Sequence, residues 1–510
     1  MKVKIKTLTP IHIGTGKRIG PLELFNNYRI DYDKLFELIA EEKQEEFIQW
    51  IDQNSQIGVQ GIKNKFGINQ HDIINKCGLY SFSGSFQKDS MNEGIKDSSY
   101  KLYIPGSSLK GSLRTALMYK VLSLPSHHQL LSNHLDYLIN QANKLRGNSS
   151  KIKDLLKNSD KKLEEEVFNC GALKKINEQL KTVYDDQKYD LLKLVKISDS
   201  TSVSTYENGE ITELQVYALK KIEPHKKFKT YAESIKNNVE LEFDISIDIE
   251  FLKRVKKELN DPNSDFGKQY FIGIEKKLRD LFDIDIKNDS ELSEEKIVET
   301  LIKAWNYYGE AVSNHEKKWV ESIKNKGNAN VNALNKLYSI SNKFKVGFGT
   351  GFSGMTILPL LLSDNTFKQK ADEFYKAVGI GFHRSTNTPL IINEFPYTRK
   401  YSNNQTIYGG FGWVQILNGN KAEKISDISQ EENKEIKIER PAHSVIAEII
   451  DDKSKPPKVK IIEGEHSGKE TILPGIRLEG LGLIKGSKIY VKLIVVNKNL
   501  QKAELKGKVE

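Results

Sequence analysis

The stretch YIPGSSLKGSLRTAL, residues 103–117, joins a turn to the start of a helix. Pro105 and Gly106 form a dipeptide that is typical of turns. Ser107 and Ser108 are residue types preferred at helix N-termini, so we expect a helix from here to about residue 124. A helix N-terminus offers unpaired amide groups and the positive end of the helix dipole, and both favour phosphate binding.

Two cations follow on the expected helix. Lys110 and Arg114 lie four residues apart, so both stand on one face and can reach the same phosphate backbone. Gly111 leaves this face bare enough for close approach. The same pattern also fits a well-capped surface helix with a glycine at a packing contact. Both interpretations stay open on the residues alone.

The second candidate binding site is the glycine-rich stretch KFKVGFGTGF, residues 343–352. Alternating glycines expose backbone amides, phenylalanines stack on bases, and lysines supply positive charge. No GK[ST] follows, so this is not a nucleotide-triphosphate loop. The alternative is a glycine-rich turn with two core phenylalanines. The candidate RNA ligands here are Lys343, Lys345, Gly347, Phe348, Gly349 and Gly351.

The composition favours a folded protein with a polyanionic partner. The chain has 510 residues, 38% of them hydrophobic, which is enough for two or three domains with real cores. Lysine and arginine outnumber aspartate and glutamate by 78 to 68, for a net charge of +10. Such a charge suits the neutralisation of phosphates, although many lysine-rich proteins bind nothing acidic.

The two cysteines exclude a disulfide framework and a cysteine-based zinc site. Cys77 and Cys170 lie far apart and form no CxxC motif, which fits a reducing compartment. The first residues alternate like a strand and contain no signal-peptide core. No apolar run approaches the length of a membrane span. We therefore expect a cytoplasmic protein with no cofactor and no metal.

The alternation of apolar residues predicts an α+β fold. Strands are expected over residues 2–13, 28–31, 191–197, 211–222 and 239–251, and helices over 33–52, 126–190 and 252–340, with irregular chain over 53–99. Strands broken by helices in this order predict the ferredoxin-like, RRM-type arrangement of split βαβ units.

Four segments follow from this pattern: an N-terminal domain over residues 1–250 with a helical insertion at 126–190, a second domain over 251–417, a charged linker over 418–440, and residues 441–510. The last segment alternates in five short strands, which favours a small closed β-barrel of the OB or S1 kind. A small β-sandwich used as a protein contact is the alternative.

Several of these motifs together resemble the RAMP superfamily of CRISPR-associated proteins. The segments that carry the resemblance are IPGSSLKGSLRTAL, LTPIHIGTG (residues 8–16), LLKLVKISDS (191–200) and the glycine-rich stretch. A later segment, FPYTRKYSNNQTIYGGFGWV (395–414), is similar to the ending of the fifth subunit of type III-A (Csm) effector complexes. The resemblance covers most of residues 1–417.

The resemblance implies a non-catalytic subunit of a ribonucleoprotein in antiviral defence. Such a subunit caps the backbone filament, holds the 3′ part of the guide RNA (crRNA), and contacts the backbone RAMP subunit and the small helical subunit. The same resemblance implies that the motif helix and the glycine-rich loop bind RNA, and more weakly that His12 and Gly14 do so. Tyr397 replaces the usual lysine of the later motif, which leaves Arg399 as its cation.

The segment GTGKRIGPLE, residues 14–23, argues against target cleavage. Backbone relatives carry a catalytic aspartate there, whereas this chain offers only Glu23. Asp199 is expected to cap a turn with Ser198 and Ser200 instead of binding a metal.

Two other functions stay open. A metal-independent endoribonuclease that processes CRISPR RNA needs a general base, for which His12, His225 and His383 are the candidates. A protein-interaction scaffold needs no RNA contact at all.

Overall fold

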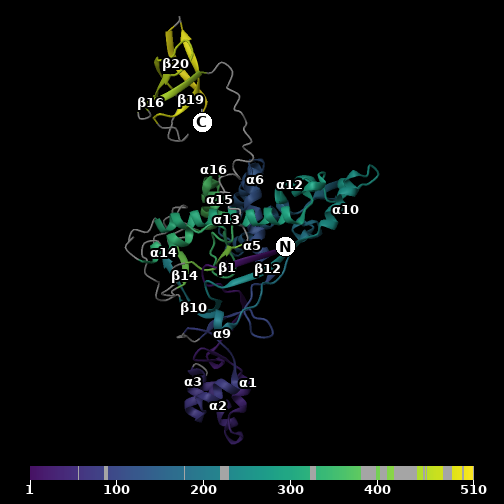
Figure 1. Ribbon diagram of the computed structural model, residues 1–510, viewed down its shortest axis with the longest axis vertical. Coiled ribbons are helices and arrows are strands. Elements are labelled where there is room, and N and C mark those ends of the chain that lie inside the picture. The colour runs from purple at the N-terminus through teal and green to yellow at the C-terminus, as the bar shows by residue number, and fades with distance from the viewer. Residues whose placement is uncertain are drawn as a thin grey trace. The chain divides into compact units, whose positions relative to one another are not determined.

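The structure is a computed structural model of the whole chain, shown in Figure 1. It describes residues 1–54, 57–84, 90–176, 179–218, 229–321, 329–380, 398–402, 410–417, 445–451, 454, 456–474, 485–496 and 499–508. The chain divides into two compact units, Met1–Asn420 and Lys421–Glu510. Helices and several β-sheets make up the first unit and a single sheet the second, which confirms the α+β class. The finer ferredoxin-like arrangement remains a prediction.

The first sheet lies in the centre of the first unit. Its strand order is β13 (Lys343–Lys345), β15 (Trp413–Ile416), β1 (Lys2–Thr7), β12 (Glu240–Ile247) and β9 (Val195–Ile197). All its neighbouring strands are antiparallel, and β1 and β12 run side by side in Figure 1. This sheet joins strands from both sides of residue 250, where we expected a domain boundary.

Alternation along β1 explains how this sheet forms. Val3, Ile5 and Thr7 are buried, whereas the lysines between them face away from the core. Helix α13 (Glu294–Glu321) packs on the buried face, where the ring of Trp305 stacks on that of Phe344 in β13 at 4.6 Å.

The second sheet has the order β14 (Thr398–Ser402), β10 (Gly209–Ala218), β11 (Lys229–Ile235), β6 (Met91–Gly94) and β2 (Gly14–Ile19). Strand β2 is the edge strand and pairs with β6 through a register shift between Gly14 and Arg18. Its first five residues are exposed, so a bulged strand end faces solvent. The strand expected over residues 2–13 in fact ends at Thr7.

Residues 20–81 form a small helical module where we expected one helix followed by irregular chain. Helices α1 (Tyr32–Glu37), α2 (Gln44–Asn54) and α3 (Gly58–Phe66) surround a hydrophobic cluster of their own with the short strands β3 (Leu24–Phe25), β4 (Tyr28–Ile30) and β5 (Gly78–Ser81). The three helices lie together in Figure 1. The expectation of irregular chain was wrong because tertiary packing stabilises these short, glycine-containing elements.

The insertion begins as expected and then changes character. Helices α6 (His128–Lys144), α7 (Ser149–Lys157) and α8 (Lys161–Phe168) cover its first part. Beyond Phe168 the chain forms a two-stranded ribbon, β7 (Ala172–Ile176) with β8 (Gln179–Val183), and not the expected helix. The helical region after β12 is confirmed, with α10 (Ile249–Asn260), α12 (Ile274–Phe282), α13 and α14 (Ala329–Tyr338) as its main helices.

The second unit is a five-stranded antiparallel sheet. The order is β18 (Glu470–Ile472), β17 (Lys458–Ile461), β16 (Val445–Asp451), β19 (Lys488–Val496) and β20 (Asn499–Lys508). Four of these match expected strands, β18 was not expected, and the strand expected over 476–482 lies outside the described residues. Thr471 Oγ1 of β18 donates to the carbonyl of Gln501 in β20 at 3.3 Å, so the two end strands approach each other. The closed barrel stays a prediction, and the expected linker over 418–440 lies outside the described residues.

Within the ranges given above, no helix combines the length and the apolar character that a membrane crossing requires.

Candidate nucleic-acid interface

Helix α5 (Gly106–Ser123) begins against the segment that carries Asp199. The amide of Gly106 donates to Oδ1 of Asp199 at 2.8 Å, and the amide of Ile104 donates to Oγ of Ser200 at 2.9 Å. A Cβ atom on Gly106 would lie 2.2 Å from the carbonyl oxygen of Ile197, so only glycine fits here. We expected Asp199 to cap a turn with Ser198 and Ser200, but its carboxylate accepts from the first amide of helix α5.

This capping changes the expected phosphate site. The carboxylate of Asp199 occupies the helix N-terminus, and the amides of Ser108 and Leu109 donate to the carbonyl of Pro105. A second anion at the same place would meet negative charge and few unpaired amides. The outer face of the helix remains open, because Ser107 and Gly111 are exposed and a Cβ atom on Gly111 would meet nothing within 4 Å.

The two cations of α5 are both partly used within the chain. Lys110 is half-buried and its ammonium donates to the carbonyl of Val195 at 2.7 Å. Burial lowers its pKa, and the neighbouring cations Arg114 and Lys193 lower it further, although Asp190 opposes them. Arg114 forms an ion pair with Asp190, and its guanidinium lies 4.5 Å from the ring centroid of Phe168. Arg114 thus holds α5 to the insertion more than it offers charge to a ligand.

The glycine-rich loop packs against both α5 and the LTPIHIGTG turn. Ser112 Oγ of α5 donates to the carbonyl of Lys345 at 2.7 Å. The amide of Phe348 donates to the carbonyl of His12 at 2.9 Å, and the two rings meet edge to face at 5.6 Å. Gly347 has a φ of +86°, and a Cβ atom there would lie 2.6 Å from the carbonyl oxygen of His12. The structure therefore brings three distant motifs together.

His12 itself is an interior residue. It is 1% exposed, and its Nδ1 lies 2.7 Å from the carbonyl oxygen of Glu233. Burial lowers its pKa, and the charge of Lys96 adds to this. A Cβ atom on Gly14 would lie 3.0 Å from Nε2 of His12, so the glycine makes room for the imidazole. These two residues shape the turn more than they touch a ligand.

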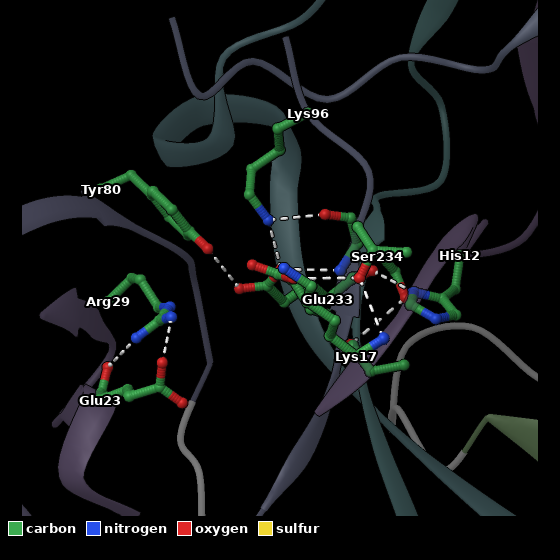
Figure 2. Close-up of polar contacts among 12 residues, drawn as sticks. His12, Lys17, Glu23, Arg29, Tyr80, Lys96, Glu233 and Ser234 are labelled. Carbon is green, nitrogen blue, oxygen red and sulfur yellow. Dashed lines mark hydrogen bonds and ion pairs between the residues drawn. The ribbon is translucent and has the colours of Figure 1, made fainter. Parts of the chain in front are cut away.

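A buried polar network supports this turn, as Figure 2 shows. The carboxylate of Glu233 accepts from Lys96 Nζ at 2.5 Å, from the amide of Gly94 at 2.8 Å and from the hydroxyl of Tyr80 at 3.0 Å. Burial raises the pKa of Glu233, against the opposing effect of Lys96. Sequence analysis missed this network because its members lie on three separate strands and loops with no shared motif.

Strand β14 carries Arg399 and Lys400, whose side chains have different surroundings. Arg399, expected as an RNA ligand, is 6% exposed, and its Nε donates to Oε2 of Glu316 in α13 at 2.8 Å. Successive side chains of a strand point to opposite faces, so the next residue, Lys400, is exposed. Its ammonium lies 5.1 Å from the ring centroid of Phe348. The later motif therefore presents Lys400 to the surface, while Tyr397 lies outside the described residues.

The two lysines of the glycine-rich stretch also point inward. Lys343 is fully buried, with its ammonium 3.2 Å from the carbonyl oxygen of Tyr338 and 3.6 Å from Glu310. Lys345 donates to the carbonyl of Thr350 at 2.8 Å, and burial lowers its pKa to about 8. The side chain of Lys343 is thus fully enclosed, whereas that of Lys345 is half-buried. The aromatics do reach the surface, with Phe348 38% and Phe352 41% exposed.

Several exposed cations were not singled out from the sequence. Lys17 and Arg18 lie on the bulged edge strand β2, whereas Lys196 lies in β9 and Lys193 in the turn before it. The first pair stands in the segment GTGKRIGPLE, residues 14–23. We call the exposed residues of these linked elements the motif surface: Lys17, Arg18, Ser107, Gly111, Lys193, Lys196, Phe348, Phe352 and Lys400.

Of the three candidate general bases, the structure describes only His12. His225 and His383 lie outside the described residues, and His12 is buried. In the described part of the chain, no cluster of three His, Cys, Asp or Glu side chains has the geometry of a metal site.

Comparisons with known proteins agree with these motifs. The CRISPR system Cms protein Csm5 of Methanocaldococcus jannaschii is 25% identical over 439 residues, which are 82% of this chain and 88% of that protein. A chain in the cryo-EM structure of a Csm–crRNA–target RNA ternary complex of a type III-A CRISPR-Cas system shares the fold, with a TM-score of 0.55 and 20% identity over 82% of this chain and all of that one. The crystal structure of T. onnurineus Csm5 matches 81% of this chain at 20% identity with a TM-score of 0.48. The model of the RAMP superfamily matches residues 4–352, and the chain belongs to this superfamily.

Proposed function

We propose that this chain is a crRNA-binding subunit of a type III-A CRISPR (Csm) complex and does not itself cut RNA. The name of the M. jannaschii relative supports membership of a Csm complex, and the shared fold with a chain of a Csm–crRNA–target RNA complex is consistent with it. The carrying observation is the motif surface, where α5, the glycine-rich loop, β14 and β2 offer two exposed rings among exposed cations.

The chemistry of the motif surface suits single-stranded RNA. The exposed ring of Phe348 can receive a base, since stacking on an aromatic ring is favourable for every base. Lys400 stands beside Phe348, where its charge reaches the phosphate attached to a stacked base. Ser107 and Gly111 leave α5 open to a backbone that passes along it. None of these contacts distinguishes one base from another, as a subunit that holds many guides requires.

The finer role rests on the resemblance. We place the chain at the end of the backbone filament, where it caps the filament and holds the 3′ part of the guide. Its neighbours there are the backbone RAMP subunit and the small helical subunit. An endoribonuclease gains no support from the motif surface, which has exposed cations and rings but no described exposed histidine.

The test is RNA binding by the full chain with a labelled oligouridine RNA across salt concentrations. Phe348→Ala should weaken binding about fivefold or more, because stacking is worth about 1–3 kcal/mol per base. Lys400→Ala should reduce the salt slope by about one, and Lys268→Ala, at an exposed lysine of α11 (Phe266–Gln269), should leave affinity unchanged. Unchanged binding in both motif-surface variants contradicts the proposal. Specific cleavage of repeat or target RNA by the purified chain contradicts its non-catalytic part.

A further inference from the structure

A cluster of charged side chains lies directly beneath the glycine-rich loop. Glu316 of α13 is 1% exposed, and its carboxylate accepts from Arg399 Nε through both oxygens, at 3.1 and 2.8 Å. Arg399 Nη2 lies 3.3 Å from Nε2 of His315, and the guanidinium stands 5.0 Å from the ring of Trp319. The half-buried Lys345 adds a second positive charge to this cluster.

The charges of this cluster balance around one carboxylate. Burial alone would raise the pKa of Glu316, but Arg399 and Lys345 outweigh it and lower that pKa to about 2. Burial lowers the pKa of His315 to about 4, so the imidazole is neutral and accepts from Arg399. Removal of the carboxylate would leave Arg399 buried without its anion, and such a change is strongly destabilising.

Three positions of the loop are held by this cluster and its neighbour Tyr308. Ser353 Oγ donates to Oε1 of Glu316, and the ammonium of Lys345 donates to the carbonyl of Thr350 at 2.8 Å. The hydroxyl of Tyr308 lies 3.1 Å from the carbonyl oxygen of Ser353 and 2.8 Å from that of Thr356. The loop is thus fixed from below at residues 350, 353 and 356, while its rings face outward.

A buried ion pair rarely adds stability over apolar packing, and its better-attested use is to select one arrangement. Here the arrangement selected is that of the loop bearing Phe348 and Phe352. A binding loop that is already ordered loses less conformational entropy when its ligand arrives.

We propose that Glu316, Arg399 and Ser353 are positioning residues that hold the glycine-rich loop in its RNA-receiving shape. The inference rests on the proposed function, because it concerns RNA binding at the motif surface. The loop is a preformed platform, and its affinity for single-stranded RNA depends on side chains that never touch RNA. Arg399, the arginine of the later motif, thus acts inside the protein by holding the loop.

The test compares full-chain variants by affinity for a labelled oligouridine RNA and by amide hydrogen exchange. Ser353→Ala removes only the bond between loop and carboxylate, so the fold should persist. We expect about fivefold weaker RNA binding, an unchanged salt slope, and faster exchange confined to residues 346–356. Glu316→Gln should have a larger effect in the same direction. Ser339→Ala, which removes an exposed hydroxyl bonded to the carbonyl of Lys336, is the matched control and should change neither quantity.

The outcomes separate the two proposals. The first outcome is that Phe348→Ala and Lys400→Ala weaken RNA binding, whereas Ser353→Ala and Glu316→Gln match the wild type in RNA affinity or in loop exchange. In that case the positioning role is overturned and the proposed function stands. If Phe348→Ala and Lys400→Ala bind RNA like the wild type, the proposed function fails and the positioning role fails with it. Arg399→Lys and Arg399→Ala are compared next. If the lysine variant shows the same loss of loop protection and of affinity as the alanine variant, the planar guanidinium is required. Together with the expected behaviour of Ser353→Ala, this result supports the positioning role of Arg399.

Discussion

At the scale of single residues, the motif cations of this chain divide into interior and surface groups. Arg399, Lys343 and Lys345 point inward, whereas Lys400, Lys17 and Arg18 point outward. The sequence shows the charges but not the direction of each side chain, because the direction depends on how the strand sits in its sheet. For this reason the sequence could not show that Arg399, expected to contact RNA, lies against Glu316.

Lys110 and Arg114 should behave differently, although we first expected them to act together. Lys110→Ala should lower the salt slope of RNA binding by about one with little loss of stability. Arg114→Ala should cost about 1–3 kcal/mol, because it leaves Asp190 and Glu164 without their cation and exposes the ring of Phe168. Melting temperatures and salt titrations of the two single variants check this. A lower salt slope with unchanged melting in Arg114→Ala would show that Arg114 does contact RNA.

Glu316 should make the stability of the first unit depend on acid pH. Its pKa is about 2 in the folded chain against an ordinary 4.5, so its stabilising contribution is complete above pH 4.5 and is lost as pH falls towards 2. The contribution amounts to about 3 kcal/mol. We therefore expect the difference in unfolding free energy between wild type and Glu316→Gln to shrink between pH 4.5 and 2. A difference that stays constant over this window in urea titrations would contradict the assignment.

At the scale of elements, helix α5 depends on its contact with the segment around Asp199. Gly106→Ala should destabilise the protein by about 1–3 kcal/mol, since the new Cβ atom would meet the backbone oxygens of Ile197 and Ser198 at 2.2 and 2.8 Å. Gly111→Ala on the same helix is the control. Its Cβ atom meets open space, so it should be neutral or stabilise the helix by up to about 1 kcal/mol. Equal melting temperatures of the two variants would show that the α5 start is not tightly packed.

The elements themselves could be predicted where their pattern is local. Strands β1 and β12 follow from alternating residues, and helix α5 follows from its turn and serines. The ribbon of β7 and β8 and the helices of the 20–81 module could not, because neighbours distant in sequence stabilise them. The convergence of α5, the turn at His12 and the glycine-rich loop follows from strand order, which no local pattern encodes.

At the scale of the whole molecule, the two units have separate hydrophobic cores. The core of the first unit runs through both of its large sheets and helices α5 and α13. Eight buried side chains form the core among the described residues of the second unit: Ala447, Ile449, Val459, Ile461, Leu473, Ile489, Val491 and Ala503. A segment of about 70 residues is near the lower limit for a self-sufficient core, so we expect only modest stability.

This separation predicts the outcome of a truncation. The chain 1–440 lacks every described strand of the second unit but keeps each strand that pairs with β1 or β10. We expect it to be soluble, to melt in one cooperative transition, and to bind oligouridine RNA with the affinity of the full chain at the motif surface. The matched piece, 441–510, should melt at a lower temperature because of its small core. Circular dichroism melts and RNA titrations of both pieces measure these quantities. An insoluble 1–440, or one without a cooperative transition, would mean that the terminal strands complete the core of the first unit.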